Sequence, residues 1–375
     1  LTLTSLPANL WAVPIVSLVT VPLILLAVIG GVFPSLSYGL WWLADFTLSG
    51  VFVPLHYLQR GWVDLGAASL LASIAGWLIV ICWRFHWWWR YAPGLAAVAI
   101  CCVLWRGKAP DYRWRVDMLD VGHGLAVVIE QNGKGILYDT GDRWPTGSAA
   151  ERHILPMLNW RNIELEQIII SHIHLDHIGG LPVMRRAFPQ ATVRSPIRGE
   201  GHLPCIAGER WRWQSLQFEV LWPPKTRKRP VNDDSCVIRI DDGQFSLLLT
   251  GDAEKQAEAQ LLRLRRDRLA ATVLQVGHHG SKTSSTPPFL RAVNPEVALA
   301  SASRYNKWRL PARKVVARYR ANGIQWRDTT RSGQLSVLFF DNDWQIKGFR
   351  EQLMPRWYHQ RFGVEGDNCL LYTSP

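Results

Sequence analysis

The chain has 375 residues, with 42 Lys and Arg against 30 Asp and Glu, which gives a formal net charge of +12. This length leaves room for more than one domain. The positive charge argues against basic partners and favours nucleic acid, phosphate or an acidic lipid surface. Basic inner-membrane proteins carry the same excess, so charge alone does not choose between nucleic acid and a membrane.

The cysteines are scattered and lack the CxxC spacing of a thiolate metal site. Three of the six lie in apolar segments, where Cys behaves as a small hydrophobe. We therefore expect neither a disulfide framework nor a thiolate zinc site. The cysteines are Cys82, Cys101, Cys102, Cys205, Cys236 and Cys369.

Uncharged segments in the first hundred residues are typical of membrane spans. Residues 8–33 carry no charge and exceed the length of about 20 residues that crosses about 30 Å of hydrocarbon. Residues 66–83 are a second candidate, and residues 91–105 are a shorter third. Residues 34–65 are aromatic and nearly uncharged, which predicts another span or an interfacial helix. Many of the 20 Trp fall in this half, as in membrane-interface belts.

Neither a soluble core nor a cleaved signal peptide accounts well for these segments. Three uncharged stretches within a hundred residues are hard to bury in a soluble core, and a cleaved signal peptide has one apolar segment. The chain starts with Leu and runs directly into an apolar span, so we expect residues 1–106 to be the C-terminal part of a longer transmembrane region. Basic residues flank the third segment on both sides, so the positive-inside rule leaves the orientation open.

From about residue 112 the pattern changes to short strands and helices. Strand-like runs surround Gly122-His123-Gly124, and hairpin turns are predicted at Asn132-Gly133 and Asp242-Gly243. Helix-like segments such as SAAERHILPMLNWRN and AEKQAEAQLLRLRRDRLAA alternate with further strands. This alternation predicts an α/β domain, which we assign to residues 107–368. Residues 369–375 match no earlier pattern, which leaves open a non-native tail.

The densest polar cluster is SHIHLDHIGGL, residues 171–181, which follows an apolar run that predicts a buried strand. His172 and His174 are separated by one residue and can turn toward one metal ion, whereas Asp176 and His177 suit a second. Imidazole and carboxylate groups are ligands of zinc, manganese or iron. A loop of surface histidines is the alternative. Four ligand-type side chains after a buried strand rarely occur without a function.

Three other predicted strand ends carry groups of the same kind. LYDTGD offers Asp139 and Asp142, LLLTGDAE offers Asp252, and LQVGHHGS offers His278 and His279. Taken alone, each Asp is as well explained by a turn or a helix cap. Taken together with the cluster, these side chains predict a site for two divalent metal ions, with zinc or manganese as the expected cofactors.

The order LYDTG, SHIHLDH, TGDAE and HHGS resembles the metallo-β-lactamase superfamily, whose signature is HxHxDH at a strand end, followed by a bridging Asp and a late His. The DVGHG, NDDSCV, HHGSKTSS and SASRYNKWRLP segments, with the apolar spans in front, resemble the C-terminal part of the ComEC family of competence DNA-uptake channels. The resemblance implies a metallo-β-lactamase αββα sandwich preceded by an all-α transmembrane region. It also implies a multi-pass protein of the inner membrane.

The resemblance implies that His172 and His174 bind one metal ion, that Asp176 and His177 bind the other, and that Asp252 bridges the two. His279 or its neighbour His278 completes the second site, and the other histidine faces the substrate. Asp139 orients the cluster loop. The predicted catalytic residues are Asp176, His278 and Asp139. The predicted substrate-binding residues are Asn232, Ser235, Ser281 and Asn306.

The chain departs from the family pattern at three places. The third-motif histidine of lactamases is absent, as in the ComEC family, so the first metal site is one protein ligand short. In the usual DVGQGDA opening, His123 replaces Gln and Leu125 replaces Asp. The usual late His-Pro is Leu310-Pro311.

By resemblance, the protein takes up DNA, and its hydrolase domain acts as a nuclease on the strand that is not transported. A pair of divalent cations about 3.5–4 Å apart makes water nucleophilic and offsets phosphate charge. The expected partners are single- or double-stranded DNA, the membrane, other competence proteins and a second copy of the chain. Two alternatives stay open: a DNA transporter with a vestigial hydrolase domain, and a membrane-tethered hydrolase of a small phosphodiester.

Two groups of side chains are candidates for DNA contacts. A basic helix is predicted over residues 255–269, where its arginines either contact phosphates or form a solvated face. Arg304, Trp308 and Arg309 either stack on and clamp a nucleotide or pack in the core.

Overall fold

The computed structural model describes residues 5–58, single positions between residues 77 and 94, residues 112–198 and residues 201–356. The chain divides into two compact units, Leu1–Gly107 and Lys108–Pro375.

Several predicted segments therefore have no described structure. The predicted spans at residues 66–83 and 91–105 lie almost entirely outside the described residues, and the tail at residues 369–375 lies wholly outside them.

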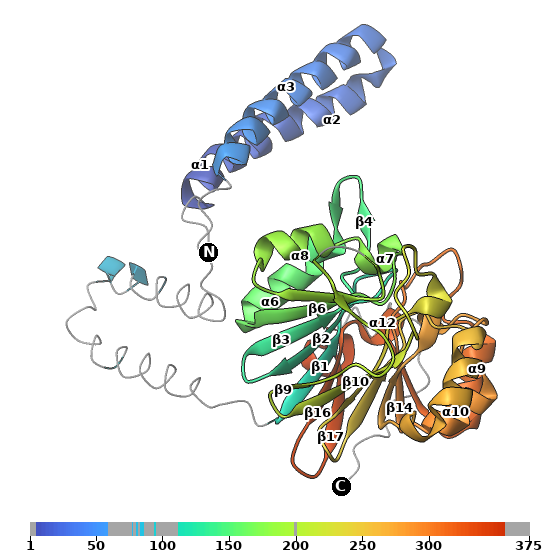
Figure 1. The fold of residues 1–375 in the computed structure, drawn as a ribbon. Coiled ribbons are helices and arrows are strands. Elements are labelled where there is room, and N and C mark those ends of the chain that lie inside the picture. Colours follow the sequence, from blue (N-terminus) through green and yellow to red (C-terminus); the bar gives the residue numbers. More distant parts are fainter. Residues whose placement is uncertain are drawn as a thin grey trace. The chain divides into compact units, whose positions relative to one another are not determined.

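The N-terminal unit contains a helical hairpin (Figure 1). Helices α1 (Ser5–Ile15) and α2 (Val21–Ile29) are joined by the π-helical turn Val16–Thr20, and α3 (Pro34–Leu58) runs back beside them. By length and composition, Ala8–Val32 is apolar enough to cross a membrane, and it is the one such segment within the described part of the chain.

Small side chains hold the two arms of this hairpin together. Thr20, Ala27 and Ala44 are buried between them. The Thr20 and Thr47 hydroxyls lie 2.9 Å apart, and Ser37 Oγ donates a hydrogen bond to Ala27 O at 2.9 Å. Small residues let helix backbones approach closely, and hydroxyl groups link helices inside membranes. The outward side chains are mostly apolar and exposed, as in a hairpin that contacts lipid or further protein.

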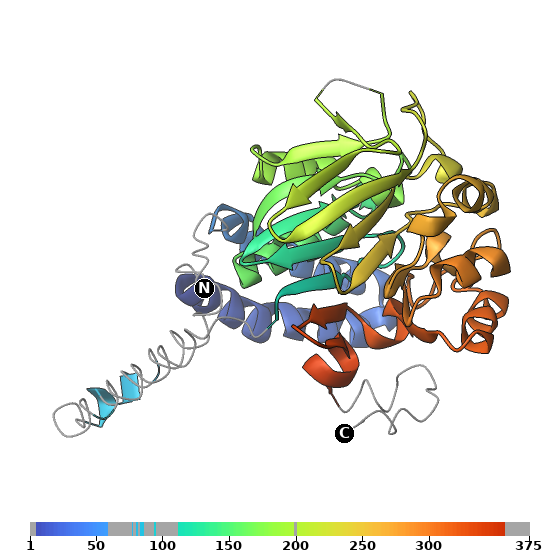
Figure 2. The same cartoon turned by 60° about the horizontal axis from the view of Figure 1, so that its bottom comes forward.

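The C-terminal unit is built on two sheets that pack face to face, with helices on both outer sides (Figures 1 and 2). The first sheet has the order β17-β16-β1-β2-β3-β6-β7-β8, antiparallel from β17 to β3 and parallel from β3 to β8. Its strands are β1 (Trp114–Met118), β2 (Val127–Gln131), β3 (Lys134–Tyr138), β6 (Glu164–Ile169), β7 (Thr192–Ser195), β8 (Leu203–Pro204), β16 (Leu335–Phe339) and β17 (Trp344–Gly348).

The second sheet has the order β15-β14-β13-β12-β11-β10-β9, antiparallel from β9 to β12 and parallel from β12 to β15. Its strands are β9 (Arg210–Trp213), β10 (Leu216–Trp222), β11 (Val237–Asp241), β12 (Ser246–Leu249), β13 (Val273–Gln275), β14 (Val297–Ala300) and β15 (Gln325–Asp328). A small ribbon, β4 (Arg143–Trp144) with β5 (Gly147–Ser148), lies beside the sandwich.

Both faces of the central strands are buried, which explains their continuous apolar runs. In β2, Val127 and Ile129 face the other sheet, whereas Val128 faces the outer helix layer. That layer covers the first sheet with α6 and α8, and the second sheet is covered by α9, α10 and α11. The helices are α6 (Leu155–Arg161), α7 (Leu175–Ile178), α8 (Leu181–Ala187), α9 (Lys255–Leu264), α10 (Pro287–Val293), α11 (Arg313–Ala321) and α12 (Thr329–Ser332).

The layers form the predicted αββα sandwich, but some predicted boundaries were wrong. The basic helix expected over residues 255–269 ends at Leu264, and Arg266–Arg268 form a short 3-10 turn. The chain leaves the helix there because buried Leu269 must enter the core before β13 begins. Strands β7, β15 and β17 are only four or five residues long and were not predicted.

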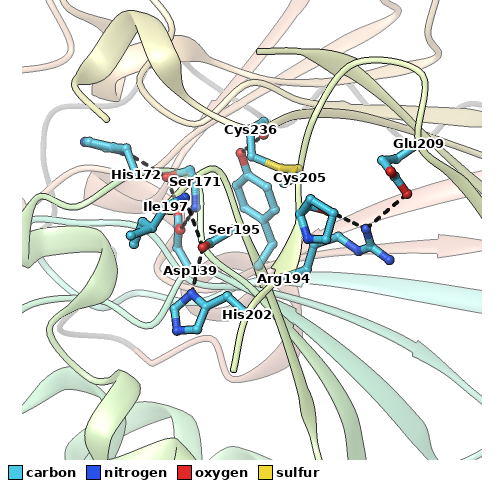
Figure 3. The surroundings of a disulfide bond; sticks show 12 residues. Asp139, Ser171, His172, Arg194, Ser195, Ile197, His202, Cys205, Glu209 and Cys236 are labelled. Atoms are coloured by element: carbon cyan, nitrogen blue, oxygen red, sulfur yellow. Dashed lines mark hydrogen bonds and ion pairs between the residues drawn. A yellow bond between two sulfur atoms is a disulfide. The ribbon is translucent and has the colours of Figure 1, made fainter. Parts of the chain in front are cut away.

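Cys205 and Cys236 form a disulfide bond, with 5.8 Å between their Cα atoms (Figure 3). The expectation that the chain lacks disulfides is therefore wrong for this pair. The two residues are 31 positions apart in the sequence, so only the fold brings them together. Cys205 follows β8 of the first sheet and Cys236 precedes β11 of the second, so the bond links the two sheets.

Replacing both cysteines by Ser is expected to lower the free energy of unfolding by about 3–4 kcal/mol, because the bond closes a loop of about thirty residues. Denaturant unfolding of the variant and the wild type measures this difference. A reductant should lower the wild-type melting temperature and leave that of the double variant unchanged. Two freely alkylated thiols at these positions in the unreduced chain would contradict the bond.

Candidate metal centre

The predicted cluster lies where four strands end. β3 leads to Asp139, β6 to the histidine loop, β12 to Asp252, and β13 to the His278–His279 pair. β3 and β6 are parallel neighbours in one sheet, and β12 and β13 are parallel neighbours in the other. Carboxyl ends of parallel strands meet at one edge of a sheet, which is where open α/β sheets place their ligand sites.

Four side chains form the centre of the site: Asp176, His177, Asp252 and His279 each offer one ligand-type atom within 4.8 Å of the others. His177 Nε2 lies 3.2 Å from Asp252 Oδ1, and His279 Nε2 lies 3.4 Å from Asp176 Oδ2. Two ligands of one divalent ion are separated by about 3–3.5 Å when each bond is about 2.0–2.2 Å. The spacing of this group is therefore that of a coordination sphere.

Asp252 lies between this group and further histidines. Its Oδ1 faces His177 and His279, at 3.2 and 3.6 Å from their Nε2 atoms. Its Oδ2 faces His172 and His278, at 3.9 and 3.8 Å. A carboxylate whose two oxygens point toward different sets of histidines has the arrangement of a group shared by two ions.

The structure also brings His174 to the site, at its solvent-facing side. The ring centroids of His172 and His174 are 4.6 Å apart, in an edge-to-face arrangement. His172 is fully buried, whereas His174 is exposed. The predicted pair therefore lies together, but its second member is open to solvent.

Unpaired polar atoms at the centre fit a metal ion. His172 Nε2, His177 Nε2, His279 Nε2 and Asp252 Oδ1 are all buried and have no hydrogen-bond partner within the described residues. Leaving a buried polar atom unpaired costs about 1–3 kcal/mol. Four such atoms facing one another would be satisfied together by a divalent cation, so the residues present fit a divalent metal ion.

Hydrogen bonds behind the histidines fix which ring nitrogen faces the centre. His177 Nδ1 lies 2.7 Å from Asp139 Oδ2, and His279 Nδ1 donates to Ser301 O at 2.9 Å. His172 Nδ1 lies 2.9 Å from Ser171 Oγ. Each contact occupies Nδ1 and leaves Nε2 as the ring nitrogen that faces the centre.

Asp139 organises this outer layer and lies one hydrogen bond behind the group of four. Its carboxylate accepts hydrogen bonds from Ser171 N and Ser171 Oγ, both at 2.7 Å (Figure 3). Asp139 itself has a left-handed backbone, with φ of 60°. Such strain at a non-glycine residue is typical of functional sites, where the surrounding structure enforces it.

Burial and neighbouring charges shift the pKa values of the ligand-type groups at the site. Burial raises the pKa of the Asp252 carboxyl, but His177 and His279 outweigh this effect and hold the pKa well below its usual range. Burial, together with the neighbouring His177, lowers the pKa of His172 well below its usual range. An ionised buried carboxylate beside a neutral imidazole is a donor pair that suits a divalent cation.

The Gly179-Gly180 pair that follows the cluster is required by close packing. A Cβ atom on Gly180 would lie 2.4 Å from Thr140 O, and one on Gly179 would lie 2.4 Å from Leu175 O. The loop of Thr140 lies close to the histidine loop because Thr140 N and Thr140 Oγ1 both donate hydrogen bonds to His177 O, at 2.7 and 2.8 Å. The glycines thus let the histidine loop lie against the loop that carries Asp139.

The predicted substrate-binding residues lie in different surroundings. Ser235 Oγ accepts a hydrogen bond from Asp252 N at 3.2 Å, so it adjoins the metal site. Asn232 Nδ2 donates to Glu254 Oε1 at 3.2 Å. Ser281 Oγ lies 3.0 Å from Thr283 Oγ1, within the loop that follows the His278–His279 pair.

Asn306, also predicted to bind substrate, uses its amide within its own loop. Asn306 Nδ2 donates to Ser303 O at 2.7 Å and to Leu310 O at 2.6 Å, and its Oδ1 accepts from Leu310 N at 2.8 Å. In this structure the side chain therefore holds the loop that precedes the Leu310-Pro311 bond.

Sequence reasoning missed several supporting residues. His278 Nδ1 lies 2.8 Å from Glu254 Oε1, which also accepts from Thr283 Oγ1 at 2.9 Å. Glu254 stands two residues after Asp252, so its place in TGDAE was an available signal. The backbone oxygen of Ser301 accepts a hydrogen bond from His279, and no sequence motif predicts such a contact.

Replacing Asp139 by Asn is expected to weaken metal binding by about 10–100-fold, because the variant loses the charged acceptor that orients His177. Titration of the purified chain with Zn²⁺ against a chromophoric chelator measures the change. Asp142→Asn is the matched control, since the Asp142 carboxylate accepts a hydrogen bond from Arg143 N at 2.7 Å and lies outside the ligand group. Equal affinities for both variants would contradict the orienting role.

The fold and the site define the class of the C-terminal unit. The metallo-beta-lactamase superfamily matches residues 119–304, the part of the chain that carries the sandwich and the ligand group. The competence protein family matches residues 1–90. The chain belongs to the ComEC family of competence proteins.

Three curated relatives illustrate the similarity. The chain is 46% identical over 373 residues to protein YcaI of Escherichia coli (strain K12), covering 98% of this chain and 49% of YcaI. It is 36% identical over 403 residues to Recombination protein 2 of Haemophilus influenzae, covering 97% of this chain and 50% of that protein. It is 36% identical over 229 residues to Competence protein ComA of Neisseria gonorrhoeae, covering 60% and 32%. The chain thus spans about half the length of the first two relatives, and a third of ComA.

Proposed function

We propose that this chain is part of an inner-membrane protein that takes up DNA during competence, and that its C-terminal unit is a metal-dependent nuclease. The observation that carries the proposal is the set of buried, unpaired Nε2 and carboxylate atoms that face one another between the two sheets' strand ends. The family matches support the DNA-uptake role, because two relatives are named for recombination and competence.

The proposed site holds two divalent ions, zinc or manganese. Asp176, His177 and His279 would hold one ion, and His172 and His174 the other. Asp252, with an oxygen toward each set, would bridge them. When bound, such ions make a water nucleophilic near neutral pH and offset the charge of phosphate oxygens.

The protein's own residues supply the remaining steps. The Asp176 carboxylate is partly exposed, and its Oδ2 faces the histidines of the ligand group, so its other oxygen would accept a proton from an attacking water. His278 has a quarter of its side chain exposed, and its bond to Glu254 directs Nε2 toward Asp252 and the open side. His278 therefore faces the substrate, whereas His279 belongs to the ligand group.

An aromatic and basic loop beside the site favours a nucleic-acid substrate. Tyr305 is 86% exposed and Trp308 is 53% exposed, which is unusual for such large side chains. Arg304 lies over the Tyr305 ring, and Lys307 lies over the Trp308 ring. Exposed rings with neighbouring cations are the platform on which unpaired bases stack and phosphates bind.

The loop is attached to the metal site through Trp308. Its ring stacks on His123 with 4.1 Å between centroids, and His123 Nε2 is 3.4 Å from Asp176 Oδ2. A base stacked on this loop would therefore bring its phosphate close to the ligand group. This supports a polymer substrate over a small phosphodiester.

Asp252→Asn is expected to reduce metal-dependent DNA cleavage at least about 100-fold, because it removes the charge shared by the two ion sites. Cleavage of labelled single- and double-stranded DNA by the full chain in detergent, with Mn²⁺ or Zn²⁺, measures it. Asp267→Asn is the control, because Asp267 is 80% exposed on the surface turn after α9.

The same assay separates the alternatives. Turnover of bis(p-nitrophenyl) phosphate without DNA cleavage would identify a tethered hydrolase of small phosphodiesters. Neither activity, with metal content below one ion per chain, would identify a vestigial hydrolase domain in a transporter. Either result would overturn the nuclease proposal.

The disulfide supports a location for the hydrolase unit. Disulfide bonds persist in the periplasm and are rare in the reducing cytoplasm. We therefore infer that the C-terminal unit faces the periplasm and that the apolar hairpin belongs to a multi-pass membrane region.

With the other four cysteines changed to Ser, a maleimide reagent should label Cys205 and Cys236 in acid-quenched cells only after reduction. In cells that lack periplasmic thiol oxidation, the same pair should label directly, because the bond would not form. Labelling without reduction in normal cells would place the unit in a reducing compartment and overturn the inference.

A further inference from the structure

We propose that His123 is an additional ligand of the metal site, adding an imidazole nitrogen on the side of Asp176 and His279. The proposal rests on the proposed metal-dependent function and extends it, since the family resemblance assigns no ligand to this position. In the usual DVGQGDA opening the position is Gln, so the ligand would be absent from chains that keep that opening.

The distance from His123 to Asp176 is that between two ligands of one ion. His123 Nε2 lies 3.4 Å from Asp176 Oδ2, the same distance that separates His279 Nε2 from that oxygen. Donors that share an ion at about 2.0–2.2 Å lie about 3–3.5 Å apart. A hydrogen bond between nitrogen and oxygen is usually shorter, at about 2.7–3.2 Å.

The loop that carries this histidine is fastened to the ligand loops at two points. Leu125 N donates to Asp176 O at 3.1 Å, and Ser301 Oγ donates to Gly124 O at 2.7 Å. Ser301 is also the residue whose backbone oxygen orients His279. A Cβ atom on Gly124 would lie 2.3 Å from Asp176 O, so only glycine allows this close approach.

Contacts with two neighbouring rings hold the imidazole in place. It stacks on Trp308 at 4.1 Å with an interplanar angle of 18°, and its centroid is 4.9 Å from that of His279.

The additional nitrogen lies on one side of the site. It lies beside the group of Asp176, His177, Asp252 and His279, next to Asp176, and would leave the His172–His174 side unchanged. The alternative role is that His123 donates a hydrogen bond to Asp176 and only positions that carboxylate. Gln keeps an N–H donor at this position and is a poor metal ligand, so it separates the two roles.

The experiment titrates the full chain in detergent with Zn²⁺ and Co²⁺ against a chromophoric chelator. His123→Ala and His123→Gln should both weaken binding of one ion at least about tenfold, and both should change the visible absorption of the Co²⁺-loaded protein. His153→Ala is the matched control, because His153 lies on an exposed helical turn away from the ligand group, and it should bind metal as the wild type does.

Three results would overturn the proposal. Unchanged affinity and spectrum in His123→Ala would exclude a ligand, and full recovery in His123→Gln would assign a positioning role. If His123→Ala does not fold, nitrogen NMR of the wild type decides, because a Zn²⁺-bound His123 Nε2 must shift on titration and an unshifted signal excludes the bond. Absence of metal binding by the wild type would instead overturn the proposed function itself.

Discussion

The burial of several lone pairs at one point is the constraint on which the rest of the C-terminal unit depends. His172, His177, His279 and Asp252 direct unpaired atoms toward one another in the protein interior. Without a cation, this arrangement costs free energy, so the surrounding structure must hold it. Asp139 provides part of this support: its backbone is strained, and its carboxylate lies within hydrogen-bond distance of His177.

Both sheets contribute residues to the site. The first sheet supplies Asp139 and the histidine loop, and the second supplies Asp252 and the His278–His279 pair. Neither sheet alone has a complete ligand group, so the site exists only when their packing is fixed. The Cys205–Cys236 bond joins the sheets directly, and Cys236 N donates to Ser171 O at 2.9 Å, one residue before the first histidine.

The N-terminal hairpin packs in a different way from the C-terminal unit. Its arms pack through small and hydroxyl residues, whereas its exposed side chains are apolar. The C-terminal unit buries its apolar residues between sheets and helices and exposes charged ones. The two halves of the chain thus expose surfaces of different character, apolar in the hairpin and charged in the C-terminal unit.

The sequence by itself determined the class of fold and indicated which segments meet at the candidate site, because HxHxDH, the late Asp and the late histidines follow apolar runs whose strand ends are local signals. It did not determine the disulfide between Cys205 and Cys236, the end of α9 at Leu264 or the approach of His123 to Asp176. These features depend on contacts between distant segments. The spacing of residues along the chain does not predict which loops come together when two sheets pack. Only the tertiary structure therefore decided these features.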